Sequence, residues 1–454
     1  MAAAAGPDRR VNLAVAKIIP LILLGIVIYA CYAVTKQLCI DYLIDPIPHH
    51  YNRSPRIGAG AAIIVVFYVL LIPVLVTYLR LFYNVAWNPG FLPRGAPSIE
   101  DQDDNGSRSS NRRHRKHRRR RSSRSRGRTT EKTDRNDMDP DVEGGLDYAA
   151  GGKAYPLNSG GLESFYTKDV FICQPDGRPS YCSTCCQFKT DRAHHCREVD
   201  RCVRKMDHFC PWVGGVVSET SFKFFIQFVF YTFIFCTFAL IVCAVFTAEL
   251  KREEGRANPH WAVGIGLSGL FGLFTFGMTI SSLQLAMLNL STIENLNRRS
   301  AVWTLAIRIP DHILNKLNTQ WAPTYRTITY PLQPVPSESQ TAPPPTYPTT
   351  GERHVFAILQ TLPGENPFDL GSPLRNLQQV LGYTIFDWLL PFKYSPCADH
   401  SSLESAFVLG PVVTRLKREA GLEASAEGEG SESGNRRSRH HRKRGKSRRR
   451  HSNI

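Results

Sequence analysis

The chain has 454 residues, 43% of them hydrophobic, with twelve cysteines and a formal net charge of +17. The positive charge is concentrated in two Arg-rich and Ser-rich segments, residues 105–135 and 436–451, while the rest of the chain is slightly acidic. Residues 105–135 contain none of the aromatic residues on which bases stack. The composition therefore argues against a nucleic-acid partner.

Four stretches of the chain lack charge, or nearly so, over lengths that can cross a hydrocarbon core, which takes about 20 residues. Four such stretches in one chain favour membrane spans over the buried helices of a soluble fold. The transmembrane helices are predicted at residues 11–35, 57–79, 224–248 and 261–290. We therefore expect an all-α polytopic membrane protein.

The distribution of Arg and Lys near the membrane ends predicts the orientation. These residues are more numerous on the side that holds both termini, which the positive-inside rule places in the cytosol. The long connection between the second and third helices then lies in the cytosol as well. We expect the protein in an endomembrane or the plasma membrane. Thiols stay reduced there, so closely spaced cysteines indicate metal ligands or catalysts rather than disulfides.

The remaining regions follow from composition. Residues 95–160 and 418–454 are too polar and too charged to bury a core, so we expect disorder, with the Arg-rich parts adhering to anionic lipids. A cysteine-rich domain is predicted at 165–222. A cytosolic C-terminal region is predicted at 291–400, containing a Pro-rich linker and a membrane-proximal apolar motif.

Six of the twelve cysteines fall between Tyr181 and Trp212. The pair Cys182 and Cys185 has the spacing of a zinc knuckle, in which a short turn directs both sulfurs to one ion. Two more ligands are needed, and four residues have suitable separations. The candidates are His194, His195, Cys196 and Cys202. The pattern predicts a structural zinc site.

The same run ends in Asp207-His208-Phe209-Cys210. A thiol reacts as its thiolate, an imidazole can take its proton, and a carboxylate can orient that imidazole. Because Pro211 disfavours the helical region for the residue before it, we expect an extended conformation at Cys210. A membrane helix follows closely, which places this thiol near the bilayer surface.

The stretch from Cys182 to Phe225, with four membrane helices around it, resembles the DHHC family of protein S-acyltransferases (palmitoyltransferases), and we expect a fungal member with the variant Asp-His-Phe-Cys. The resemblance implies acyl transfer from palmitoyl-CoA to cysteines of substrate proteins. It implies that Cys210 is acylated, with His208 as base and Asp207 orienting it. We further expect Trp212 and Phe235 to contact the acyl substrate.

Members of this family usually bind two zinc ions. The first site matches this chain completely, whereas the second matches only at Cys196 and has apolar residues at its other positions. The implied first-site ligands are Cys182, Cys185, His195 and Cys202. The apolar replacements are Val199, Phe209 and Val216. We therefore expect one zinc ion, with an apolar cluster in place of the second.

Three further motifs are similar to family motifs in edited form. They are Asn88-Pro89-Gly90, Ser291-Thr292-Ile293-Glu294 and the segment from Asn366 through Asn376. A catalytically silent zinc-containing membrane adaptor is the alternative. Such an adaptor would have no need for Asp207, His208 and Cys210 together, so the intact triplet favours the enzyme.

Overall fold

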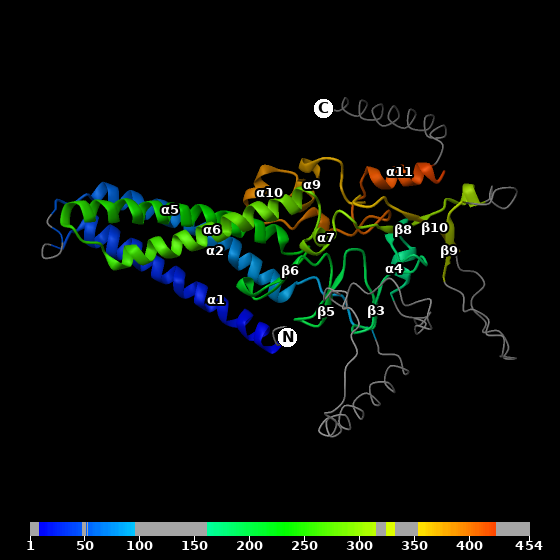
Figure 1. Ribbon diagram of the computed structural model, residues 1–454, viewed down its shortest axis with the longest axis horizontal. Coiled ribbons are helices and arrows are strands. Elements are labelled where there is room, and N and C mark those ends of the chain that lie inside the picture. Colours follow the sequence, from blue (N-terminus) through cyan, green and yellow to red (C-terminus); the bar gives the residue numbers. More distant parts are fainter. Residues whose placement is uncertain are drawn as a thin grey trace, which may run out of the picture.

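The computed structural model describes residues 9–47, 51, 53–95, 161–314, 324–331 and 353–423. Three predicted features fall wholly or mostly outside these ranges. They are the Arg-rich loop, the Pro-rich linker and the C-terminal tail. Figure 1 shows long helices gathered at one end of the molecule and a part with short strands at the other end.

Four apolar helices form the bundle at one end (Figure 1). They are α1 (Arg9–Cys31) with its π-helical continuation η1 (Tyr32–Ile44), α2 (Ile57–Trp87), α5 (Phe222–Glu254) and α6 (Pro259–Met287). Each is long and apolar enough to cross a membrane. The chain is therefore a multi-pass membrane protein.

The connection between α5 and α6 is short, and the residues in it favour the end of one helix and the start of the next. Gly255 adopts a left-handed conformation at φ 69° directly after α5, where a residue without Cβ is favoured. The Asn258 side chain accepts a hydrogen bond from the backbone N–H of His260, and Pro259 occupies the first turn of α6. The two helices consequently run antiparallel as neighbours.

The prediction of an all-α protein is wrong, because the part outside the bundle contains strands. Three hairpins make up the cysteine-rich region. They pair β2 (Tyr181–Cys182) with β3 (Gln187–Phe188), β4 (His194–Cys196) with β5 (Arg201–Val203), and β6 (His208–Cys210) with β7 (Gly215–Val217). Strands of two or three residues are too short to show a period-two pattern.

A four-stranded antiparallel sheet was also missed, since it joins segments far apart in sequence. Its order is β1 (Val170–Ile172), β8 (Thr304–Arg308), β10 (His354–Gln360) and β9 (Arg326–Tyr330). Aromatic residues cover one face, among them Phe171 and Phe356. Val413 and Leu416 of α11 (Pro411–Glu419) cover the other. This sheet fixes the C-terminal region beside the cysteine-rich domain.

The other helices in the described part of the chain are short, and most of them lie in the C-terminal region. They are α4 (Glu163–Tyr166), α7 (Thr292–Leu296), α9 (Pro373–Leu381) and α10 (Ile385–Leu389), with the 3-10 turns η4 (Pro211–Val213) and η5 (Pro396–Ala398). Side chains of α5 hold α10 against the bundle. Gln227 donates to the carbonyls of Asp387 and Trp388, and Tyr231 donates to that of Leu389.

Candidate functional site

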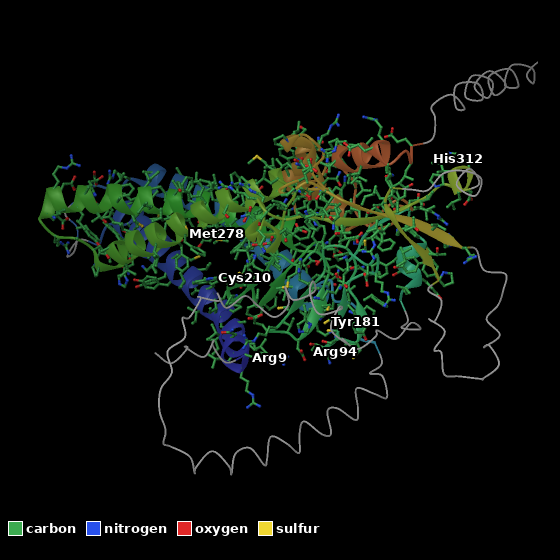
Figure 2. The ribbon with its side chains drawn as sticks, turned by 45° about the vertical axis from the view of Figure 1, so that its right-hand side comes forward. Arg9, Arg94, Tyr181, Cys210, Met278 and His312 are labelled. Carbon is green, nitrogen blue, oxygen red and sulfur yellow. The ribbon has the colours of Figure 1, made fainter. Side chains whose placement is uncertain are left out.

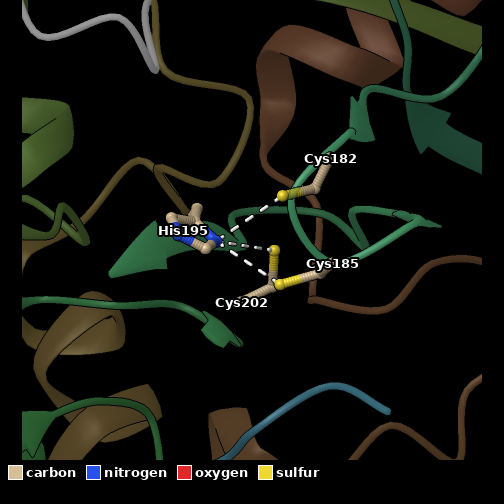
Figure 3. Close-up of side chains that lie close together, drawn as sticks. All are labelled: Cys182, Cys185, His195 and Cys202. Carbon is tan, nitrogen blue, oxygen red and sulfur yellow. Dashed lines mark hydrogen bonds between the residues drawn. The ribbon is translucent and has the colours of Figure 1, made fainter. Parts of the chain in front are cut away.

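The first part of the site is a cluster of three cysteines and one histidine (Figure 3). Cys182 ends β2 and Cys185 lies in the turn after it, while His195 on β4 and Cys202 on β5 face each other directly across their hairpin. The four ligand atoms lie within 4.8 Å of one another. Sequence spacing had left four candidates for the third and fourth ligands, and the structure brings together His195 and Cys202.

The distances within the cluster are compatible with a metal site. The Nδ1 atom of His195 lies 3.5, 3.4 and 3.9 Å from the sulfurs of Cys182, Cys185 and Cys202. Ligands of a tetrahedral zinc ion, with Zn–S of about 2.3 Å and Zn–N of about 2.0 Å, are separated by about 3.5–3.8 Å. The other ring nitrogen faces Asp200 at 3.6 Å, the arrangement in which a carboxylate orients a metal-bound imidazole. These residues fit a metal ion.

The second part of the site is the Asp207, His208 and Cys210 triplet at the start of the third hairpin. The Nδ1–H of His208 donates to Asp207 Oδ2 at 2.7 Å. Cys210 is 6% exposed and has extended backbone angles, φ −122° and ψ 105°, in accord with the effect expected of Pro211. Figure 2 places Cys210 where the helix bundle meets the strand-containing part.

Asp207 is held by the first turn of α7. Its Oδ1 accepts the backbone N–H of Thr292 at 2.9 Å, and its Oδ2 accepts the Thr292 hydroxyl at 2.8 Å. Burial disfavours the charged imidazole, but hydrogen bonds to Asp207 and Cys210 outweigh it and raise the pKa of His208 to about 9. The His208 ring packs edge-on against Phe225, with ring centroids 5.2 Å apart. The imidazole is therefore oriented by one neighbour and confined by another.

An apolar cavity of about 160 Å³ lies among the four membrane helices. Phe235 lines it, as do side chains of α1, α2 and α6. Trp212, two residues after Cys210, packs on Phe271 of the cavity wall, with ring centroids 6.1 Å apart. The hydroxyl of Tyr78, another wall residue, donates to the Trp212 carbonyl. The cavity thus reaches the segment that carries the thiol.

The three apolar residues at the second-site positions share one cluster with Cys196. Val216 is 1% exposed, and Val199 and Phe209 pack against it. Phe209 lies directly opposite Val216 in the pairing of β6 with β7. Since side chains alternate along a strand, Phe209 enters this cluster while its neighbours His208 and Cys210 point to the opposite face. The cluster anchors the strand that carries the thiol.

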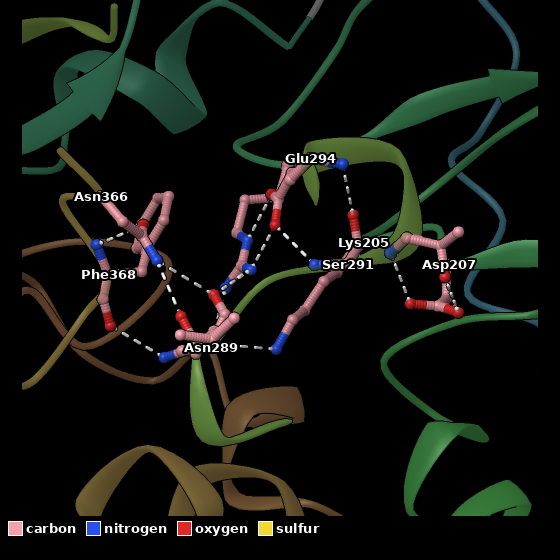
Figure 4. Close-up of polar contacts among 10 residues, drawn as sticks. Lys205, Asp207, Asn289, Ser291, Glu294, Asn366 and Phe368 are labelled. Atoms are coloured by element: carbon pink, nitrogen blue, oxygen red, sulfur yellow. Dashed lines mark hydrogen bonds and ion pairs between the residues drawn. The ribbon is translucent and has the colours of Figure 1, made fainter. Parts of the chain in front are cut away.

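A buried polar network links the cysteine-rich domain to the end of α6 (Figure 4). Both Arg192 and Glu294 are nearly inaccessible, and their side chains form two hydrogen bonds at 2.7 and 2.6 Å. Arg192 also donates to the side chain and the carbonyl of Asn289. The Ser291 side chain and Glu294 form a capping box for α7. This network fixes the turn that presents Thr292 to Asp207.

The C-terminal motif joins the same network. Asn366 donates to the carbonyls of Leu288 and Asn289 (Figure 4), and Asn376, 1% exposed, donates to that of Met287 at 2.9 Å.

The turn after α2 contacts the cysteine-rich domain through its backbone carbonyls. The carbonyl of Asn88 accepts from Thr220, that of Pro89 from Ser218 and that of Gly90 from the backbone of Arg204.

Sequence reasoning singled out the motif at 291–294 but missed its role as the support of Asp207. It also missed Arg192 and Asn289. Arg192 is 102 residues from Glu294 and 97 from Asn289. No local pattern signals such a pairing, because Arg192 is one of several arginines in the cysteine-rich run and nothing in the sequence distinguishes it from the others.

The fold and the site define a class of protein. It is a multi-pass membrane protein in which a Cys and His cluster lies beside an Asp-His pair and a thiol, next to an apolar cavity. The family model described as DHHC palmitoyltransferase matches residues 176–299, the stretch that holds both parts of the site.

Two relatives match nearly the whole chain. Palmitoyltransferase pfa5 of Aspergillus fumigatus is 68% identical over 426 residues, which cover 94% of this chain and 94% of that protein. Palmitoyltransferase pfa5 of Emericella nidulans is 61% identical over 443 residues, covering 94% of this chain and 90% of that protein. A probable protein S-acyltransferase of Arabidopsis thaliana is 32% identical over 28% of this chain and 33% of its own length. The chain belongs to the DHHC palmitoyltransferase family, and its near full-length relatives are fungal.

Proposed function

We propose that this chain is a protein S-acyltransferase that moves a palmitoyl group from palmitoyl-CoA to cysteines of substrate proteins through an acyl-Cys210 intermediate. One observation carries the proposal. Cys210 shares a hydrogen bond with His208, which Asp207 holds, and Trp212 two residues later packs on Phe271 of the cavity wall. That arrangement joins a means of activating a thiol to a space for a lipid chain.

The proposed reaction has two steps. The Cys210 thiolate attacks the carbonyl carbon of the CoA thioester while His208 holds the thiol proton, the bond to the CoA sulfur breaks, and CoA leaves with that proton. A cysteine of the substrate protein then gives its proton to His208 and attacks acyl-Cys210, and the proton returns to the Cys210 sulfur as it leaves. Asp207, held by Thr292, keeps the imidazole oriented through both steps.

The cavity is proposed to hold the acyl chain. Burial of a chain among apolar side chains contributes about 0.8 kcal/mol per methylene, which favours long chains. Phe235 is a candidate determinant of chain length because it lines the cavity. Trp212, packed on the wall at Phe271, is proposed to contact the chain near its thioester end.

We propose that the Cys182, Cys185, His195 and Cys202 cluster holds one structural zinc ion. Support comes from the spacing of the four ligand atoms and from the thiolate and imidazole donor set, which suits zinc. Bound zinc would crosslink two hairpins, and no reaction step uses it. The apolar cluster around Phe209 supports the loss of the second family site.

The orientation and the partners are proposed from the sequence. The positive-inside rule supports cytosolic termini and a cytosolic active site, where acyl-CoA is available and where membrane-proximal cysteines of substrates arrive. Adhesion of the Arg-rich segments to anionic lipids is a proposal about residues outside the described ranges. Nucleic acid is not expected as a partner, and the membrane compartment is an endomembrane or the plasma membrane.

Labelling with fluorescent palmitoyl-CoA tests the proposal on the purified full chain. Cys210→Ala should reduce hydroxylamine-sensitive self-labelling to background, because the acceptor sulfur is gone. The matched control Cys186→Ala removes a half-buried thiol of the same domain that lies outside the metal cluster, and it should label like the wild type. Undiminished labelling of Cys210→Ala would refute the assignment, and an unlabelled but folded wild type would support the silent adaptor.

A further inference from the structure

The apolar cavity among the four membrane helices continues well past Phe235. Its lining on α5 runs from Phe228 to Cys243, a length of about 22 Å at about 1.5 Å per residue. His208 marks the level of the reacting thiol, because its ring packs on Phe225 near the start of α5. Counted along the helix axis from Phe225, Phe235 lies about 15 Å deeper and Cys243 about 27 Å deeper.

Phe235 forms a side wall of this cavity rather than its end. Its ring centroid lies 4.9 Å from that of Phe67 on α2, which is fully buried and stands outside the cavity lining. Many of the side chains that line the cavity deeper than Phe235 are small, and they come from three helices. They include Ala30, Ala33, Cys236, Ala239, Gly264 and Ser268. These small residues leave room for a chain to pass Phe235.

The lining ends where α5 and α6 approach each other at Cys243 and Gly264. A Cβ atom at position 264 would stand 3.1 Å from the Cys243 sulfur, closer than such atoms ordinarily approach. Phe246 and Trp261 lie one helical turn further on, outside the lining. The Tyr42 ring packs edge-on against both of them, with centroids 6.1 and 4.8 Å apart. This aromatic group closes the cavity just beyond Gly264.

The deep part of the cavity suits an apolar occupant. Ser268 and Tyr29 bring hydroxyl groups to its lining, and both hydroxyls are already hydrogen-bonded. Ser268 donates to the carbonyl of Gly264 at 2.6 Å, and the Tyr29 hydroxyl lies 3.0 Å from Nδ1 of His260. Neither hydroxyl therefore needs a partner from a bound molecule, and a hydrocarbon chain leaves no polar group unsatisfied there.

We propose that Gly264 sets the upper limit on the length of the acyl chain, because the lack of a side chain there leaves room for the last carbons. The inference rests on the proposed acyl transfer through Cys210, and it places the limit deeper than Phe235. An extended chain advances about 1.3 Å per carbon, given a C–C bond of about 1.5 Å, so a 16-carbon chain of about 20 Å passes Phe235. On the same basis, the distance to Cys243 corresponds to about 20 carbons.

Acylation with a mixture of chain lengths tests the limit. The purified full chain is incubated in detergent with equal amounts of saturated acyl-CoAs of about 12 to 22 carbons, and mass spectrometry of the intact chain identifies the acyl group on Cys210. Gly264→Val fills the end of the cavity and displaces about two methylenes, each worth about fourfold in binding. The ratio of 20-carbon to 14-carbon adduct should therefore fall about fifteenfold. The 14-carbon adduct should persist, because that chain ends before Gly264.

Two further variants separate filling of the cavity from disturbance of α6. Gly266→Val adds the same side chain to an exposed position of α6, where a Cβ meets nothing within 4 Å in the described part of the chain, and it should keep the wild-type ratio. Ala30→Leu fills the deep part from α1 and should lower the ratio without burdening the contact of α5 with α6. Wild-type ratios in both Gly264→Val and Ala30→Leu would overturn the inference.

Phe235→Ala distinguishes the two candidate positions for the limit. If Gly264 sets it, this variant widens the cavity beside the chain and leaves the longest accepted chain unchanged. Acceptance of longer chains by Phe235→Ala would place the limit at Phe235 and overturn the inference, while acyl transfer through Cys210 would stand. A wild type that carries no acyl group of any length would instead refute the proposed function.

Discussion

The two hairpins β4–β5 and β6–β7 have strands of equal length but are held in different ways. The first supplies His195 and Cys202 to the metal cluster, where ligand atoms crowd within 4.8 Å. The second supplies Phe209 and Val216 to an apolar cluster that contains one cysteine, Cys196. A structural zinc ion contributes about 10–16 kcal/mol in small domains, whereas a buried apolar side chain contributes about 1.5–3 kcal/mol.

We infer from this difference that the strand bearing Cys210, the proposed nucleophile, does not need a metal ligand within it. Side chains alternate along β6, so Phe209 faces the apolar cluster and anchors the strand, while His208 and Cys210 face the proposed active site. An apolar anchor there has one clear chemical advantage. It leaves out two thiols and an imidazole that would compete with Cys210 and His208 for metal and for protons.

Removal of one metal ligand should have the largest effect on bound zinc and on self-acylation. Cys185→Ser deletes a ligand of the cluster, so we expect the purified variant to lose its zinc and its self-acylation, because the first hairpin loses its crosslink. The wild type should contain one zinc ion per chain by elemental analysis. Cys186→Ser, at the adjacent position outside the cluster, should retain both zinc and labelling.

Two zinc ions per chain in the wild type would contradict the claim that only the β4–β5 hairpin takes part in a metal site, whatever the behaviour of Cys185→Ser.

Reintroduction of a polar ligand into the apolar cluster should have an intermediate effect. Phe209→His places an imidazole among Val199, Val216 and Cys196 without a complete set of ligands, and an unsatisfied buried polar group costs about 1–3 kcal/mol. We expect a lower melting temperature in detergent and still one zinc ion. Phe209→Leu, which keeps the site apolar, should lose less stability.

The combination Val199→Cys, Phe209→His and Val216→Cys should bind a second zinc ion with Cys196 and recover stability relative to Phe209→His alone. A triple variant that binds no additional zinc would show that the second hairpin has lost the geometry of a metal site as well as its ligands.

The sequence predicted the parts of this protein that depend on local pattern. Membrane spans follow from some 20 consecutive apolar residues, and the knuckle of Cys182 and Cys185 follows from its spacing. The role of Cys210 as the nucleophile was inferred from its neighbours and from a family resemblance, and it stays a prediction. The three apolar replacements were predicted to cluster, and the structure places them together with Cys196.

The parts that escaped prediction depend on contacts between distant segments. The sheet pairs β1 with β8, about 135 residues later, and Arg192 meets Glu294 at a separation of 102 residues. Lys205 looks like an ordinary surface lysine in the sequence, and only tertiary packing reveals its burial. Strands of two or three residues carry too little pattern to be recognised before their partners are known.

The smallest expected effect concerns another contact that stabilises the β6–β7 hairpin, and this effect varies with pH. Glu219, two residues after β7, faces His400 of the C-terminal region at 3.1 Å. The other ring nitrogen of His400 faces the carbonyl of Ala406 at 2.7 Å, so both nitrogens face acceptors and the imidazolium form is favoured. The hydrogen bond to Glu219 raises the pKa of His400 above its usual value, although burial opposes it.

A raised pKa in the folded state means that this pair stabilises the protein fully below about pH 6.5, and that its contribution disappears as the pH rises through the raised value. His400→Gln should therefore lower stability by about 1 kcal/mol at pH 6 and by much less at pH 9. Melting of the purified chain in detergent at both pH values measures the difference, with Ser401→Ala at an exposed neighbouring position as the control. A deficit that stays the same at both pH values would mean that His400 stabilises the second hairpin by packing, as Phe209 does, and that the apolar mode of fastening extends to the C-terminal region.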